Sequence, residues 1–171
     1  MKVLAALALL AAAPEAPYRH LESVRLKAPI VCVGTVAEVK RVGALEGLAA
    51  PTQGRMEATV TVGKVLRAPA EAAAPSSVVV RYDTRSPEPA GDGFFTLAVG
   101  DRVLVFAETF DKAYPRELLH GPPAGLSQQV ATLRAALDAM DAPSLALHGL
   151  TPATRLQQAK LYEAALAALK K

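Results

Sequence analysis

Apolar and polar residues alternate along several stretches in the first two thirds of the chain, which is the pattern of half-buried β-strands. Gly, Pro and Asp residues bound these stretches, and such residues end strands and form turns. The pattern predicts five strands, over residues 30–42, 55–67, 77–83, 94–99 and 102–109.

The first predicted strand, 30–42, changes character along its length. Its first half is apolar on both faces, and its second half is half polar, with Gly34 at the change. A Gly inside a strand often marks a bulge or a bend, and Gly63 interrupts the alternation of 55–67 in the same way. We therefore expect bulges at both glycines, and a long, bent first strand that contributes to two parts of a small barrel.

The last third of the chain has helical periodicity instead. Ser127 can cap a helix, and Thr151 followed by Pro152 predicts the start of a second one. The first apolar stripe contains Leu126, Val130, Leu133, Leu137 and Met140. The second contains Leu156, Ala159, Tyr162, Leu166 and Leu169. We interpret both stripes as surfaces that pack in the core and not as partner-binding faces.

Together these elements predict a mainly β protein with C-terminal helices, in the α+β class. Five strands, long connections after the first and third, and trailing helices fit a small five-stranded Greek-key barrel of the OB type followed by two α-helices. A twisted sheet packed on the two helices is the alternative. The predicted organisation is a leader over 1–16, a barrel over 17–114, a Pro/Gly linker over 115–125, and a helical segment over 126–171 that packs on the barrel.

The N-terminus has the pattern of a signal peptide. Lys2 precedes an uninterrupted apolar run over 3–13, which is too short to span a bilayer and ends in the small residues Ala11, Ala12 and Ala13. We expect cleavage within 12–17, export to the periplasm or out of the cell, and no transmembrane segment after the leader is removed. Cys32 is the only cysteine, so an internal disulfide is excluded, and we expect it to be a small buried apolar residue.

The net charge of +3 argues against nucleic-acid binding because of where it lies. The excess of Lys and Arg falls within 151–171, where positive side chains interact favourably with the C-terminal end of a helix. Residues 17–150 carry no net charge. Nucleic-acid binders usually carry a concentrated basic stripe. Most aromatic residues cluster within 82–114, where we expect them to build one end of the core, with an exposed binding patch as the alternative. They are Tyr82, Phe94, Phe95, Phe106, Phe110 and Tyr114.

No pattern of catalytic residues stands out. His20, His120 and His148 lie far apart and at no metal-ligand spacing, so the sequence predicts no metal and no cofactor. There is no nucleophile elbow and no phosphate-binding Gly motif. The carboxylates that could form an acid/base pair are Asp83, Asp92, Asp101, Glu108 and Asp111. Nothing in the sequence favours one of them, and a non-enzyme is the preferred interpretation.

Four stretches carry a resemblance to a known family. They are similar to the barrel strands of the netrin-like and tissue-inhibitor-of-metalloproteinases (TIMP) group. The stretches are 28–36 (Ala-Pro-Ile-Val-Cys-Val-Gly-Thr-Val), 57–69, and 78–84 followed by 95–108. The resemblance implies a bacterial OB-fold protein of that group. The family's inhibitors chelate a protease zinc through an N-terminal Cys-x-Cys, which this chain lacks. None of their functional residues carries over to a matching position.

We therefore expect an exported, non-catalytic OB-like binding or protein-interaction module, whose partner is a protein or an envelope component. In OB barrels one face and its flanking loops form the ligand surface, which points here to the loops over 43–54 and 84–93. The candidate contacts are Arg81, Asp83, Arg85 and Asp92. One alternative is a protease inhibitor that acts by another mechanism, and a second is a hydrolase with an unrecognised carboxylate pair.

Overall fold

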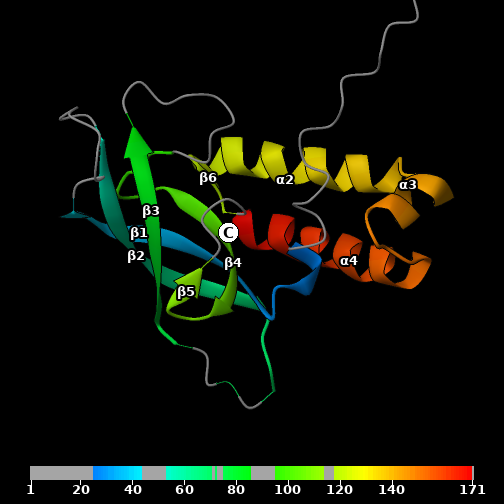
Figure 1. Cartoon of the computed structure of the whole chain (residues 1–171), viewed down its shortest axis with the longest axis horizontal. Helices are drawn as coiled ribbons and strands as arrows, with labels where there is room; N and C mark the ends of the chain where they lie inside the picture. The colour runs from blue at the N-terminus through cyan, green and yellow to red at the C-terminus, as the bar shows by residue number, and fades with distance from the viewer. Residues whose placement is uncertain are drawn as a thin grey trace, which may run out of the picture.

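A computed structural model describes residues 25–43, 53–70, 72, 75–85, 95–113 and 118–170. In this part of the chain one antiparallel sheet of six strands packs against C-terminal helices, so the predicted α+β class is confirmed (Figure 1). The strands are β1 (Ile30–Gly43), β2 (Gln53–Arg67), β3 (Ser77–Arg85), β4 (Arg102–Thr109), β5 (Lys112–Ala113) and β6 (Leu119–Gly121). Their order is β3-β2-β1-β4-β5, and β6 pairs with the same edge of β4 as β5, at the other end of that strand.

Four of the five predicted strands are confirmed, and the one predicted over 94–99 is wrong. Within the described residues, 95–98 pair with no strand and lead into a turn at 99–100, where Gly100 has a φ of +95°. Phe95 and Leu97 are nevertheless buried, with Thr96 and Ala98 exposed between them. The alternation over 94–99 therefore predicted correctly which side chains are buried, but it did not predict that this segment stays outside the sheet. Phe94 lies outside the described residues.

The two apolar faces of early β1 belong to two separate cores. Ile30 and Cys32 join a strand core, built on one face of the sheet. Val31 and Val33 join a helix core on the opposite face. The strand core also contains Val36, Ala58, Val60, Val78, Val80, Tyr82, Phe95, Leu97, Val103, Val105, Ala107 and Leu118. Cys32 is fully buried, and burial raises the pKa of its thiol to about 11, so its predicted role as a small apolar residue is confirmed.

The two predicted bulges prove to be a single one, and it lies where β1 and β2 pair. Val33 lies opposite Lys64 and Gly34 opposite Val62, which leaves Gly63 as an extra residue on β2. A Cβ at Gly34 would lie 2.5 Å from the carbonyl oxygen of Thr61, so only glycine allows the two backbones to approach so closely.

The sheet brings the two ends of its strand order near each other without closing. In the described residues β3 pairs with β2 alone. The Val79 N–H donates to the Phe110 carbonyl oxygen (3.4 Å), which links β3 to the turn before β5. The aromatic residues divide between the two cores. Tyr82 and Phe95 stack in the strand core with ring centroids 4.6 Å apart, whereas Phe106 faces the helices, so a single aromatic end of the core is wrong.

Three helices follow the sheet, and α2 and α4 run side by side against it (Figure 1). They are α2 (Pro123–Asp138), α3 (Ala142–Leu147) and α4 (Pro152–Leu169). The predicted linker over 115–125 is wrong in part, because it contains β6 and the first residues of α2. Ser127 is not the cap: Pro123 occupies the first turn, and the Ser127 hydroxyl donates to its carbonyl oxygen (2.9 Å).

The predicted stripe of α2 is confirmed: Leu126, Val130 and Leu137 are buried, and Leu133 and Met140 pack against them. The start of α4 is also confirmed. Thr151 Oγ1 accepts the Thr154 N–H (3.2 Å), and Thr154 Oγ1 accepts the Thr151 N–H (2.8 Å).

One predicted contact of α4 is wrong. Ala159, Tyr162 and Leu169 are buried and Leu166 is partly so, as predicted. Leu156, however, is 57% exposed, and the fully buried position nearest to it is Gln158. The helix is therefore rotated so that a polar residue enters the interior near its start.

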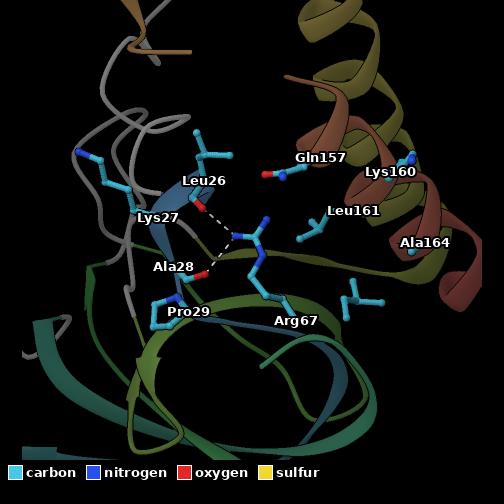
Figure 2. Close-up of a pocket in the computed structure, with 10 residues that line it drawn as sticks. Leu26, Lys27, Ala28, Pro29, Arg67, Gln157, Lys160, Leu161 and Ala164 are labelled. Atoms are coloured by element: carbon cyan, nitrogen blue, oxygen red, sulfur yellow. Dashed lines mark hydrogen bonds between the residues drawn. The ribbon is translucent and has the colours of Figure 1, made fainter. Parts of the chain in front are cut away.

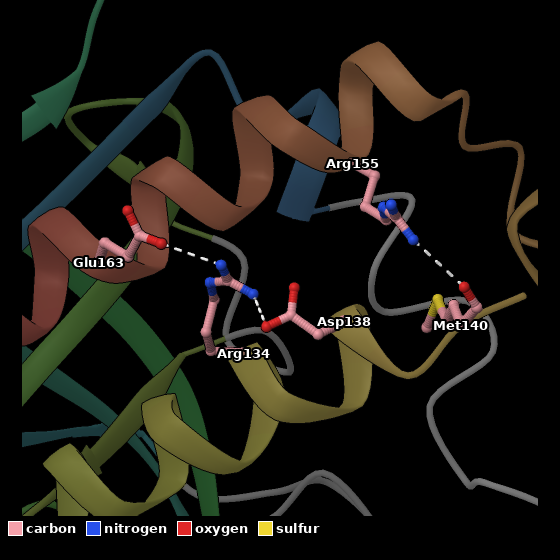
Figure 3. Close-up of polar contacts among 5 residues, drawn as sticks. All are labelled: Arg134, Asp138, Met140, Arg155 and Glu163. Atoms are coloured by element: carbon pink, nitrogen blue, oxygen red, sulfur yellow. Dashed lines mark hydrogen bonds and ion pairs between the residues drawn. The ribbon is translucent and has the colours of Figure 1, made fainter.

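Polar contacts also join α2 to α4, and α4 to the turn between α2 and α3 (Figure 3). Arg134 on α2 pairs with Asp138 one turn later and donates from Nη2 to Glu163 Oε1 on α4 (2.9 Å). Arg155 Nη1 donates to the Met140 carbonyl oxygen (3.3 Å). No helix in the described part of the chain is long and apolar enough to cross a membrane. The predicted leader over 1–16 and most of the predicted loops 43–54 and 84–93 lie outside the described residues.

Candidate functional site

The outer face of β1, β2 and β3 carries a set of charged side chains. Ala58, Val60, Val80 and Tyr82 point into the strand core, so the residues that alternate with them lie on the opposite side of the sheet. We call this surface the charged face. Its charged residues include Glu38, Lys40, Arg55, Glu57, Arg81 and Asp83.

Strand register places three of these residues in a row across the sheet. Lys40 lies opposite Glu57, and Glu57 lies opposite Arg81. Lys40 Nζ is 2.8 Å from Glu57 Oε1, and Arg81 Nε donates to Glu57 Oε2 at 3.1 Å. The Glu57 carboxylate on β2 therefore bridges a cation on β1 and a cation on β3. Such cross-strand ion pairs stabilise the pairing of neighbouring strands.

The ion pair between Lys40 and Glu57 shifts the pKa of both side chains. The hydrogen bond from Lys40 is the main cause that lowers the pKa of Glu57, and Arg81 acts in the same direction against the partial burial of the carboxylate. The same hydrogen bond raises the pKa of Lys40. The Glu57 side chain is only 15% exposed, whereas those of Lys40 and Arg81 are 51% and 67% exposed. The two cations are thus the accessible part of this row.

A second pair lies beside this row. Arg55 and Asp83 are opposite each other in register, with Arg55 Nε 3.8 Å from Asp83 Oδ1. The predicted site residues Arg81 and Asp83 therefore do share one face, and each has a partner on β2. Arg85 ends β3, but its side chain and the whole of Asp92 lie outside the described residues.

Sequence reasoning missed Lys40, Arg55 and Glu57. Their signal was present, because Arg55 and Glu57 alternate with the apolar Met56 and Ala58. What the sequence lacked was the register, which decides that Glu57 falls between Lys40 and Arg81.

The remaining candidate carboxylates serve local structure. Asp101 Oδ2 accepts the Ala98 N–H (2.9 Å), and Glu108 pairs with Lys112 one hairpin turn later. Asp111 Oδ1 accepts the Thr109 hydroxyl (2.6 Å), and this hydrogen bond lowers the pKa of Asp111. Each carboxylate is fixed in a separate turn or hairpin contact, which gives no acid/base pair among these three.

The histidines also take separate positions. The His120 ring lies against Phe95, with centroids 5.2 Å apart, and His148 ends α3. His20 lies outside the described residues. In the part of the chain that is described, no three His, Cys, Asp or Glu side chains come close enough together to hold a metal ion.

The chain was compared with models of known protein families, with curated proteins and with solved structures, and none of the three comparisons gave a match.

Proposed function

We propose that the protein is an exported, non-catalytic protein-interaction module with an OB-like barrel, and that the charged face is its ligand surface. The observation that carries this proposal is the exposed row of charges on β1–β3, with Lys40 and Arg81 more than half accessible. The helices lie over Val31, Val33, Leu104 and Phe106 and so leave this row uncovered. A partner is therefore free to reach it.

The OB-like part of the proposal rests on the connectivity. The order β3-β2-β1-β4-β5 puts β3 and β5 at the two ends, and the Val79 to Phe110 hydrogen bond lies between those ends. We propose that the sheet completes a five-stranded Greek-key barrel there, as the resemblance to the netrin-like and TIMP group implies. In such barrels the face formed by the early strands binds the ligand, which is where the charged face lies.

A protein partner fits the charged face better than a nucleic acid does. The face carries carboxylates (Glu57 and Asp83) between its cations (Lys40, Arg55 and Arg81). A phosphate backbone would meet repulsion at each carboxylate. A protein surface can present both signs in a matching arrangement, and such complementarity sets the specificity of an interface.

The test uses a photo-reactive amino acid in place of Thr59, which lies on β2 between Glu38 and Val79 in register. The full chain is expressed in an exporting host, and adducts are identified by mass spectrometry. The same amino acid at Gln128, an exposed position of α2, is the positional control. We expect a partner adduct from position 59 and none from position 128.

A charge swap then tests whether the charges matter. The double variant Arg81→Glu with Asp83→Arg keeps the net charge and should abolish the adduct. The matched control is Glu108→Lys with Lys112→Glu, which swaps an exposed pair in the β4–β5 hairpin and should leave it intact. An adduct that survives the first swap contradicts the charged face as the ligand surface. If the partner is a protease, its activity with and without the chain decides whether the module is an inhibitor.

Export is tested separately by the mass of the protein that leaves the cytoplasm. Removal of the leader should give a new N-terminus within 12–17. An exported fraction that still begins at Met1, or no exported protein at all, contradicts the signal peptide.

A further inference from the structure

A cavity of about 490 Å³ lies between residues 26–29, the end of β2 and the side of α4 (Figure 2). Leu26, Leu66 and Leu161 provide much of its apolar wall. The volume is within the range of small-molecule sites, which is about 300–1,000 Å³. It is at the opposite end of β2 from the charged face, roughly 30 Å along the strand from Glu57, so it is a separate site.

Every ionisable side chain that lines this cavity is a cation. They are Lys27, Arg67 and Lys160, and among the described residues no carboxylate lines the wall. None of the three forms an ion pair within the described residues. The cavity therefore combines an apolar wall with positive charge that protein carboxylates in this part of the chain do not neutralise.

Arg67 is the cation at the centre of the cavity, and hydrogen bonds fix its orientation (Figure 2). Its Nη1 donates to the carbonyl oxygens of Leu26 (2.8 Å), Ala28 (3.1 Å) and Arg25 (3.3 Å). Its Nη2 donates to Gln158 Oε1 (3.4 Å). These acceptors are neutral, so they hold the guanidinium in place and leave its charge uncompensated. Burial lowers the pKa of Arg67, which is the effect of a charge that is partly removed from water.

We propose that the cavity binds an anionic amphiphile, with a carboxylate or phosphate headgroup on Arg67 and an alkyl chain along Leu26, Leu66 and Leu161. An anion there would return to Arg67 the electrostatic stabilisation that burial removes, and a guanidinium is suited to bind oxyanions with two hydrogen bonds. The apolar wall supplies the second half of the recognition, since each buried methylene contributes about 0.8 kcal/mol. A small inorganic anion would use only the first half.

The ligand chemistry is tested with three probes added to the full chain, with backbone amide NMR shifts as the readout. Decanoate has both parts, decanol lacks the charge, and acetate lacks the chain. Decanoate, kept below its micelle concentration, should shift the amides of 26–28 and 157–164 in a saturable way and bind at least tenfold more tightly than the other two. Equal binding of decanol contradicts recognition of the anion. Equal binding of acetate contradicts recognition of the chain, and no shift with decanoate contradicts the site.

Variants locate the binding site. Arg67 holds three carbonyls in place, so its loss would test folding as much as binding. We use Lys160→Glu and Gln157→Glu instead, since both positions are exposed and line the cavity. Each should weaken decanoate binding at least tenfold. Lys170→Glu, beyond the end of the same helix, is the matched control and should change binding less than twofold. An equal loss in Lys170→Glu would show a general charge effect and overturn the proposal.

Discussion

The outer surface of the sheet has two parts that differ in what lies on them. Over early β1 and β4, Val31, Val33, Leu104 and Phe106 are covered by α2 and α4. Over late β1, β2 and β3, the same surface carries Lys40, Glu57 and Arg81 and stays open. Both parts share the strand core on the opposite face. One sheet can therefore present both an internal wall, where its residues are apolar, and an open charged surface.

The transition between the two parts falls within β1. Its pairing with β2 shifts register between Val33 and Gly34 and again between Val36 and Glu38. Residues before these shifts are apolar on both sides, and Glu38 and Lys40, which follow them, are exposed. Bulges bend a strand and increase its twist, which allows β1 to leave the helices and continue into the charged face.

The largest expected effect comes from the covered part. Phe106→Ala removes a fully buried ring beneath the helices and should lower the free energy of unfolding by about 3–5 kcal/mol, as large cavities do. Leu147→Ala is the control, because Leu147 is 75% exposed and should cost at most about 0.5 kcal/mol. Urea unfolding followed by circular dichroism measures both. A loss under about 1 kcal/mol for Phe106→Ala would mean that the helices do not depend on this contact.

The bend itself is tested at two glycines. At Gly34 an added Cβ would lie 2.5 Å from the Thr61 carbonyl oxygen and from Val60 Cγ1, so Gly34→Ala must displace backbone and should cost about 1–3 kcal/mol. At Gly63 the nearest atom to an added Cβ is the Val33 carbonyl oxygen at 3.5 Å, an ordinary contact. Gly63→Ala should therefore stay within about 0.5 kcal/mol of the parent in the same unfolding experiment. Equal losses at the two positions would show that close approach is not what keeps Gly34.

Alternation and turn residues were enough to predict most of the fold. The run at 30–33 was predicted to be apolar on both faces, and both faces are buried. Thr151-Pro152 located the start of α4 to the residue. Two of the failures, at 94–99 and at 115–125, share one cause, which is that burial and strand pairing are different properties. Phe95 and Leu97 are buried without pairing, whereas Leu119–Gly121 pair with β4 inside a stretch rich in Pro and Gly.

The candidate site was predicted less completely. Arg81 and Asp83 were predicted because they alternate with apolar residues in the predicted strand 77–83. The structure places both side chains on the same face of the sheet. Their partners could not be found, because the pairs join residues 24 and 28 positions apart through a register that no local pattern encodes. The cavity at Arg67 was missed for the same reason: it joins the turn at 26–29, β2 and α4, which meet only in the folded chain.

A smaller effect is expected where the helical cover begins. Thr151→Ala removes the N-cap that accepts the Thr154 N–H, and it should cost about 1 kcal/mol. Thr132 is a matched control on α2, where its hydroxyl donates to the Gln128 carbonyl oxygen inside the helix (2.9 Å). Thr132→Ala should be neutral or slightly stabilising, because alanine has the higher helix propensity and gives up only that internal contact. A Thr151→Ala variant as stable as Thr132→Ala would contradict the capping box.

The smallest and most local effect concerns the charge row of the open part. Because its pKa is lowered in the folded state, Glu57 contributes stability above its unfolded pKa of about 4.3, and this contribution is lost as pH falls through the folded pKa. Lys40→Met removes the main cause of the shift, so the pKa of Glu57, measured by carboxyl ¹³C NMR, should rise toward its ordinary value. Lys112→Met removes the partner of Glu108 instead and should leave Glu57 unchanged. If the pKa of Glu57 is the same in the parent and in Lys40→Met, the row is held by Arg81 alone, and the open part has one accessible cation that acts on this carboxylate instead of two.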